Sequence, residues 1–367
     1  MKKKIMLLSL VMLSTMSLFG CKKEEPVEEE HKEEPVIEES KELEEPEEVE
    51  VKAVKEVLSE DENLLTGLPT LAPEAIGKRP FAIMVNNVNA AMPQYGIEQA
   101  DVIFELPVEE DLTRFMAMYG DYTNVPKVCA IRSCRYNFPT LSEGFDAFYA
   151  YWGMSESTQP FFDSLEMDYF NGMVNTGGLF GRDQDRLNAG YPLEHTATFN
   201  GTGLVEAIEG NGMRSDIEED NAMPAFLFQP SEEQVAPIGE DCNSLQINFG
   251  AAVADFTYDA ESKLYAKKLN GNDQIDGNTG NVLTFSNVFV LETEIGLLEN
   301  GVHKKIDMVE GNGYYISNGV IQEIQWEKEG GEPNAPLLFF GADDNELIIN
   351  RGKSYISFTR ADSMDVL

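Results

Sequence analysis

Arginine is the residue type in this chain that most strongly suggests a binding site. Six arginines and two lysines lie between residues 78 and 186, whereas seven lysines and two arginines lie between residues 263 and 360. Lysine is sufficient for solubility, but the planar guanidinium group binds a carboxylate or phosphate through two parallel hydrogen bonds. The enrichment of arginine in an acidic protein therefore predicts a recessed anion-binding site in the first half of the chain.

Several of these side chains follow predicted buried strands. Asn86 follows the apolar run 81–85, Arg132 follows the run 128–131, and Arg135 lies just beyond it. Ligands of layered α/β sheets usually meet the carboxyl ends of the strands. The alternative is that the arginines form structural ion pairs with the many carboxylates around them. The predicted ligand-binding residues are Asn86, Arg114, Arg132, Arg135, Ser155, Arg182 and Arg186.

Catalysis is a weaker hypothesis, and its candidates are His195 and Asp183. His195 is the only histidine in the folded first half, and a neutral imidazole can act as a general base. The alternative is a structural histidine. The segment 153–157 resembles a nucleophile elbow only in part, because Ser157 occupies the place of its last glycine. A triad of Ser155, His195 and Asp183 is therefore weakly supported.

The chain shows no strong metal or cofactor motif. It contains no HExxH, paired-cysteine or GxxxxGK pattern, and the segment 273–278 lacks the spacing of a calcium loop. We therefore predict neither a metal site nor a cofactor. Three cysteines follow Cys21, an odd number, and we predict no structural disulfide among Cys129, Cys134 and Cys242.

The N-terminus predicts the location of the protein. Lys2, Lys3 and Lys4 precede an apolar run over residues 5–19, and Gly20 and Cys21 follow it. This is the pattern of a lipoprotein signal peptide over residues 1–20, cleaved before Cys21 and lipidated on it. The run is too short to cross a bilayer comfortably. We expect a lipid-anchored protein on the extracytoplasmic side of the cell membrane; the alternative is an ordinary signal peptide with a chance cysteine.

An acidic segment separates the anchor from the folded protein. Residues 22–62 hold nineteen Asp and Glu against six Lys, and such a segment cannot bury enough apolar surface to fold. We therefore interpret residues 21–62 as a disordered tether. The net charge of the whole chain is −38, which disfavours nucleic acid as a partner.

The pattern of apolar residues changes near residue 235. Short apolar runs alternate with helical segments at 137–144, 155–167 and 200–210, which predicts a layered α/β domain over 63–232. From residue 240, period-two alternation and turns such as Asn270-Gly271 predict antiparallel hairpins. The fold class is therefore α+β: a layered α/β N-terminal domain with a mixed sheet, then a smaller, mostly antiparallel β domain over 240–367.

Several motifs resemble those of the YerB-like bacterial lipoproteins, which carry two successive domains of unknown function. The similar segments cover nearly all of residues 63–360 and include Asn63-Leu64-Leu65-Thr66-Gly67-Leu68-Pro69, Arg79-Pro80-Phe81-Ala82-Ile83-Met84-Val85-Asn86-Asn87 and Ile131-Arg132-Ser133-Cys134-Arg135. The resemblance implies an envelope-anchored protein and supplies no catalytic mechanism. Tyr151 and the triplet Glu194-His195-Thr196 depart from the family pattern, which weakens a histidine-dependent activity more than an arginine-based site.

These observations favour a non-enzymatic accessory protein of the cell envelope. It would recognise an anionic envelope ligand or a cell-wall-synthesis protein through the arginine cluster. The alternative is an envelope hydrolase or transferase acting on a wall precursor that bears phosphate or carboxylate. A third possibility is that the β domain is the partner surface and the arginines form internal ion pairs.

Overall fold

The computed structural model describes residues 54–174 and 177–367. The predicted signal peptide, Cys21 and most of the predicted tether lie outside the described residues. The last part of that tether is described, and it contacts the folded domain: Lys55 forms an ion pair of 3.0 Å with Glu346, and Glu62 is buried in β1 (Glu62–Asn63). In the two described ranges, no helix combines the length and the apolar character needed to cross a bilayer.

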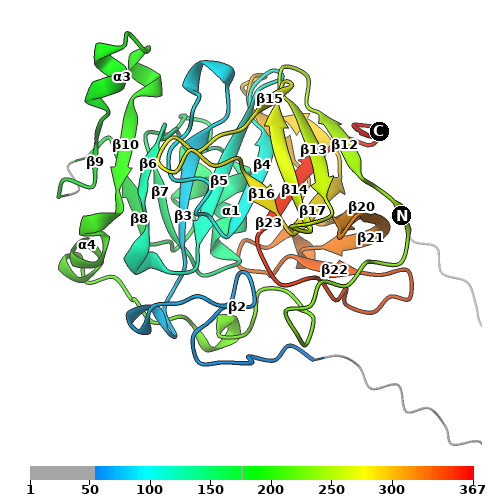
Figure 1. Ribbon diagram of the computed structural model, residues 1–367. Coiled ribbons are helices and arrows are strands. Elements are labelled where there is room, and N and C mark those ends of the chain that lie inside the picture. Colours follow the sequence, from blue (N-terminus) through cyan, green and yellow to red (C-terminus); the bar gives the residue numbers. More distant parts are fainter. Residues whose placement is uncertain (1–53, 175–176) are drawn as a thin grey trace, which may run out of the picture. The chain divides into compact units, whose positions relative to one another are not determined.

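One large mixed sheet organises the molecule (Figure 1). In spatial order its strands are β11 (Glu240–Asp241), β21 (Val320–Glu327), β20 (Glu310–Ser317), β17 (Asn287–Glu292), β23 (Ser354–Thr359), β4 (Val102–Pro107), β5 (Thr113–Tyr119), β3 (Phe81–Asn86), β7 (Phe148–Tyr151) and β8 (Tyr169–Asn171), with β22 (Leu338–Phe340) beside β21. β23 and β4 are parallel and align Ser354 with Val102. Both predicted halves of the chain therefore contribute to one continuous sheet.

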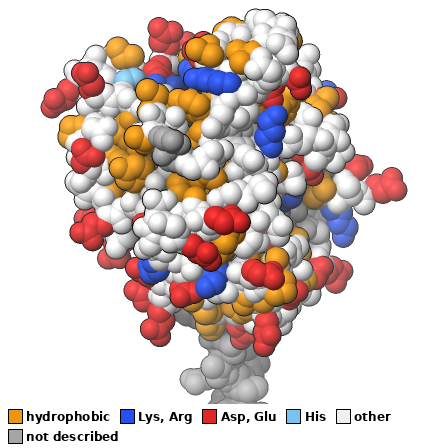
Figure 2. All heavy atoms as spheres, turned by 90° about the vertical axis from the view of Figure 1, so that its left-hand side faces the viewer, with side chains coloured by type: hydrophobic (Ala, Val, Ile, Leu, Met, Phe, Trp, Pro, Cys, Tyr) orange, Lys and Arg blue, Asp and Glu red, His pale blue; other side chains and the backbone are white. Residues whose placement is uncertain are grey.

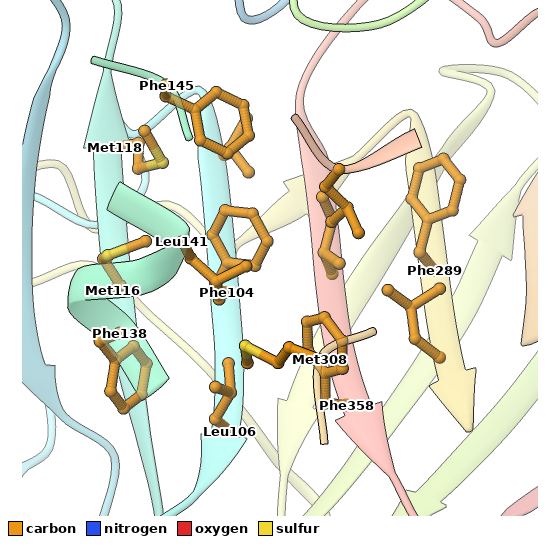
Figure 3. Packing of buried hydrophobic residues seen from close by; sticks show 14 of the residues in the cluster. Phe104, Leu106, Met116, Met118, Phe138, Leu141, Phe145, Phe289, Met308 and Phe358 are labelled. Carbon is orange, nitrogen blue, oxygen red and sulfur yellow. The ribbon is translucent and has the colours of Figure 1, made fainter. Parts of the chain in front are cut away.

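The central strands are buried on both faces, as their continuous apolar runs predict. Alternate residues of each strand point to opposite faces, so that Phe104 and Ile103 belong to different cores. The face that carries Phe104 packs against α1 (Asn137–Glu143), which contributes Phe138 and Leu141 (Figure 3). α2 (Gln159–Phe162) adds Phe162 to this core.

A second, antiparallel sheet covers the opposite face. Its strands are β15 (Asn272–Asp273), β14 (Leu264–Leu269), β13 (Val253–Asp259), β12 (Ser244–Asn248) and β24 (Met364–Val366), with β16 (Thr284–Phe285) beside β14. Phe256 of β13 packs against Tyr355 of the large sheet, with ring centroids 4.8 Å apart. The α+β class, with a mixed N-terminal sheet and a mostly antiparallel C-terminal one, is confirmed.

Short elements complete the fold. They are β2 (Leu68–Pro69), which pairs with β1; the sheet of β6 (Lys127–Cys129), β10 (Ala197–Asn200) and β9 (Phe180–Arg182); the hairpin of β18 (Ile295–Leu297) and β19 (Lys304–Ile306); and the helices α3 (Gln184–Asn188) and α4 (Leu204–Gly210). The helix predicted over 155–167 is reduced to α2, which begins at Gln159. The hydroxyl of Ser155 lies 2.9 Å from that of Thr158.

A buried charge network joins the two halves; we call it the core network (Asn87, Glu105, Thr113, Lys267, Gln274 and Tyr355). Glu105 of β4 and Lys267 of β14 are fully buried and lie 3.5 Å apart. Asn87 and Thr113 donate to one oxygen of Glu105, and Tyr355 donates to the other, each at 2.7 Å. Lys267 also donates to Gln274 at 2.8 Å. The network satisfies two buried charges at once, which is the condition for tolerating them in a core.

The three cysteines of the described residues are buried free thiols. Burial raises the pKa of Cys134 to about 12 and that of Cys129 to about 11. These thiols are therefore protonated near neutral pH and are inert packing groups.

Candidate functional site

The candidate site lies at one edge of the large sheet, where several parallel strands end. β3 ends at Asn86, and Glu109 follows the end of β4. β5 runs in the opposite direction and begins at this edge, so its register places Arg114 opposite Asn86. The loop after β7 brings Ser155 to the same edge. The strand ends predicted from the sequence thus converge here.

Two arginines converge on one carboxylate at this edge. Arg135 donates to Oε1 of Glu109 from Nε at 2.7 Å and also from its second terminal nitrogen. Arg114 donates to the same oxygen at 3.2 Å and to the carbonyl of Ser133 at 2.6 Å. The other oxygen of Glu109 is buried and has no hydrogen-bond partner among the described residues. A single carboxylate therefore accepts hydrogen bonds from two guanidinium groups.

Electrostatics at Glu109 reflect this excess of positive charge. Burial raises the pKa of Glu109, but the charges of Arg114 and Arg135 outweigh burial and lower it overall. Burial, together with the charge of Arg135, lowers the pKa of Arg114 to about 9. Glu109 is therefore ionised at neutral pH, while Arg114 carries a proton that its surroundings disfavour.

A histidine from the C-terminal half completes this group. The Glu109 backbone forms an isolated antiparallel bridge with His303, and Nε2 of His303 lies 3.6 Å from Oε1 of Glu109. Nδ1 of His303 lies 2.9 Å from the hydroxyl of Ser157. We call Glu109, Arg114, Arg135, Ser157 and His303 the edge cluster.

Arg132 belongs to a neighbouring group, which we call the His195 cluster (Asn86, Arg132, Glu194 and His195). Arg132 pairs with Glu194 at 3.2 Å, and Asn86 donates to Nδ1 of His195 at 2.9 Å. Burial and the charge of Arg132 lower the pKa of His195, although Glu194 opposes them. Ile131 forms a backbone bridge with Val85, which places Arg132 near Asn86 and therefore near Arg114, the residue opposite Asn86.

The remaining predicted residues have structural partners. Arg186 is 3% exposed, donates to the carbonyls of Ala91 and His195 and lies over the ring of Tyr95. Asp183 caps α3 and pairs with Lys127 at 2.6 Å. Because Arg186 and Asp183 bind these partners, neither residue belongs to the edge cluster.

Arg182, like Arg186, has a backbone carbonyl and an aromatic ring as partners. It donates to the carbonyl of Leu193 at 2.6 Å and stacks over the ring of Trp152 at 4.3 Å. The structure therefore divides the predicted arginines into the edge cluster (Arg114 and Arg135), the His195 cluster (Arg132) and two residues with backbone and aromatic partners (Arg182 and Arg186).

Sequence reasoning missed three members of the edge cluster: Glu109, Ser157 and His303. The only available signals were that Glu109 follows a predicted strand and that His303 is one of three histidines in the chain. Nothing in the sequence pairs residue 109 with residue 303. Among the described residues, no group of three or more His, Cys, Asp or Glu side chains is arranged to hold a metal ion.

Acidic side chains are spread over the side of the molecule that carries β9, β10, α3 and α4, where basic side chains are fewer and hydrophobic side chains gather in one area (Figure 2). The net charge of the chain is −38, so an anion is repelled at long range and is attracted only where a positive group acts at short range.

Both halves of the chain match the domains of a known protein family. Residues 65–214 match the N-terminal domain model of a protein family of unknown function, DUF3048, and residues 245–356 match its C-terminal domain model. The chain belongs to the DUF3048 family. The edge cluster therefore joins residues from both domains of the family, since His303 lies in the second.

A relative and a solved structure agree with this assignment. The chain is 29% identical over 273 residues to the protein named "Putative lipoprotein YerB" of Bacillus subtilis (strain 168), covering 73% of this chain and 78% of the relative. The crystal structure of YerB from Bacillus subtilis matches with a TM-score of 0.70 and 26% identity, over 82% of this chain and 97% of that one.

Proposed function

We propose that this protein is an extracytoplasmic accessory lipoprotein of the cell envelope, held at the cell membrane by a lipid on Cys21. The signal-peptide pattern that ends at Cys21 and the lipoprotein name of the Bacillus subtilis relative support this proposal. The acidic segment after Cys21 would hold the folded domain near the membrane surface without binding to anionic lipid.

Its binding function is recognition of an anionic group, carboxylate or phosphate, on an envelope ligand or on a cell-wall-synthesis protein. The observation that carries this proposal is the convergence of Arg114 and Arg135 on one oxygen of Glu109. With Arg132 and its partner Glu194, the edge holds three guanidinium groups against two carboxylates, an excess of one positive charge.

Arg132 is the arginine best placed to bind an incoming anion. Its side chain is 25% exposed, compared with 5% for Arg114, and its partner Glu194 is 57% exposed. An ion pair this accessible to water is worth little, so an anionic ligand can displace Glu194 at small cost. The Nε of Arg132 is also buried without a partner among the described residues. A ligand oxygen would satisfy it.

The test is isothermal titration calorimetry of the full-length lipoprotein in detergent, with citrate and inorganic pyrophosphate as probes at constant ionic strength. Arg132→Gln should weaken binding about 10- to 100-fold, because a hydrogen bond to a charged group contributes about 1.5–3 kcal/mol. The matched control is Lys268→Gln, which removes the same charge from the second sheet and should leave affinity unchanged. Equal loss in both variants, or no binding of either probe, would refute the proposal.

A further inference from the structure

The contact between Ser157 and His303 is of a kind that supports catalysis rather than anion binding. Ser157 lies in the loop between β7 and α2, and His303 lies directly before β19. Both side chains are only partly buried, and the hydroxyl lies 2.9 Å from Nδ1 of the imidazole. A serine and a histidine at hydrogen-bond distance are the minimal pair for activating a serine nucleophile.

The surroundings of His303 fix its tautomer. The amide oxygen of Asn300 accepts from the backbone amides of Val302 and His303, both at 3.0 Å, which orients the amide group. The amide nitrogen of Asn300 then lies 2.7 Å from Nδ1 and can only donate to it. Nδ1 is therefore an acceptor, and the imidazole proton resides on Nε2, facing the carboxylate of Glu109.

The protonation state of His303 also suits a base. Burial and the charge of Arg135 lower its pKa, although Glu109 opposes them. The imidazole is therefore neutral near pH 7, which is the form that accepts a proton. Asn300 also donates to the oxygen of Ser157 at 2.9 Å, and that oxygen lies 3.0 Å from the hydroxyl of Ser155. The Ser157 hydrogen points to Nδ1 when Ser155 is the donor in their contact.

We propose that Ser157 and His303 form a nucleophile–base pair for acyl transfer, with Glu109 as the positioning residue that orients the imidazole. The order of contacts, hydroxyl to imidazole to carboxylate, is that of a catalytic triad with the two ring nitrogens exchanged. At 3.6 Å, Glu109 acts on the ring through charge and orientation rather than through a hydrogen bond.

The proposed ester hydrolysis has two stages, acylation of Ser157 and hydrolysis of the acyl-serine. The Ser157 oxygen bonds to the carbonyl carbon of an ester while its proton passes to Nδ1 of His303, and the carbonyl electron pair moves to the carbonyl oxygen. Return of that pair breaks the bond to the leaving alcohol, which takes the proton from His303. Water then attacks the acyl carbon while His303 accepts its proton. Collapse of this intermediate breaks the bond to the Ser157 oxygen, which takes the proton from His303, and a carboxylic acid is released.

The preferred substrate class is an ester that carries a carboxylate or phosphate near the reacting carbonyl. Arg114 and Arg135 donate to the same Glu109 oxygen that lies 3.6 Å from Nε2 of His303, so both guanidinium groups lie near the imidazole. The same charges would stabilise the oxyanion of the tetrahedral intermediate. Only this preference rests on the anion binding proposed above; the nucleophile–base pair itself does not.

The test is covalent labelling of the full-length lipoprotein in detergent with a fluorophosphonate, followed by peptide mass spectrometry. We expect one adduct, on Ser157, which Ser157→Ala removes and the surface control Ser164→Ala retains. His303→Asn should slow labelling about 100-fold or more. Circular dichroism melting curves establish that each variant is folded. No adduct, an adduct on another residue, or wild-type labelling of the folded His303→Asn variant would overturn the proposal.

Two further measurements separate this proposal from anion binding. Glu109→Gln should shift the midpoint of the labelling rate against pH to lower pH, because the carboxylate raises the pKa of His303; a purely structural Glu109 would leave the midpoint in place. Mono-p-nitrophenyl terephthalate, whose carboxylate cannot reach its own ester, should be hydrolysed by the protein at least tenfold faster than p-nitrophenyl benzoate. If Ser157 is labelled but the two esters react equally, the acyl-transfer pair stands and the anion preference fails.

Discussion

Two carboxylates four residues apart, Glu105 in β4 and Glu109 just after it, have opposite environments. Glu105 is fully buried, and both of its oxygens accept hydrogen bonds within the core network. Its charge is matched by one cation, Lys267. Glu109 is 17% exposed and faces two arginines through one oxygen, and the other oxygen has no hydrogen-bond partner within residues 54–174 and 177–367.

The difference shows how to separate structural from functional charge in this protein. A neutral, fully hydrogen-bonded network has no capacity left for a ligand, and disrupting it leaves a buried charge unpaired. A site with excess charge, partial exposure and an unpartnered oxygen can still bind. The three predictions below test this distinction, from the largest expected effect to the smallest.

The largest effect should follow the loss of the cation in the core network. Lys267→Met leaves Glu105 charged and unpaired in the core, which should reduce the free energy of unfolding by about 3–5 kcal/mol. Urea denaturation measures it. The adjacent Lys268 pairs with the surface residue Asp273, so Lys268→Met should change stability by less than about 0.5 kcal/mol.

A double variant sharpens this prediction. Glu105→Gln combined with Lys267→Met removes both charges and keeps an amide oxygen as an acceptor for the buried donors of the network, so it should recover part of the stability lost in the single variant. If Lys267→Met alone costs less than about 1 kcal/mol, the core network is not the structural junction described here.

An intermediate effect should follow neutralisation of Glu109. Glu109→Gln removes the internal competitor for Arg114 and Arg135, so it should tighten citrate binding about tenfold, while the loss of charged hydrogen bonds lowers stability by about 1–3 kcal/mol. Glu105→Gln should leave citrate affinity unchanged. Calorimetric titration and urea denaturation of both variants give the comparison, and weaker citrate binding by Glu109→Gln would contradict the excess-charge interpretation.

The smallest effect should be a loss of stability in mild acid. Burial lowers the pKa of both His195 and His303 below the usual 6.5. As pH falls below 6.5, the unfolded chain therefore binds more protons than the folded protein, and the free energy of unfolding decreases. Unfolding curves between pH 7.5 and 5.5 should show this slope, and His303→Asn should flatten it. An unchanged slope in that variant would show that His303 does not contribute.

The sequence predicted the local part of the site. The apolar runs that end at Asn86 and Arg132 are strands or strand-like segments, and they do meet at one sheet edge. Arg186 does not join the other predicted arginines at this edge. It donates to the carbonyl of Ala91 and lies over the ring of Tyr95, and both of these residues lie about ninety residues earlier in the chain. A pattern of residue types cannot indicate which carbonyls will be buried around a side chain.

Sequence alone therefore determined which segments end in polar residues after a strand, and that the second half is mostly antiparallel. These features depend on the alternation and length of apolar runs, which are local properties. Only the tertiary structure decided that His303 meets Glu109 and Ser157, and that Lys267 neutralises Glu105. Such pairings join residues that are far apart in the sequence. They form only when the two halves of the chain pack together, and no local pattern of residues encodes that packing.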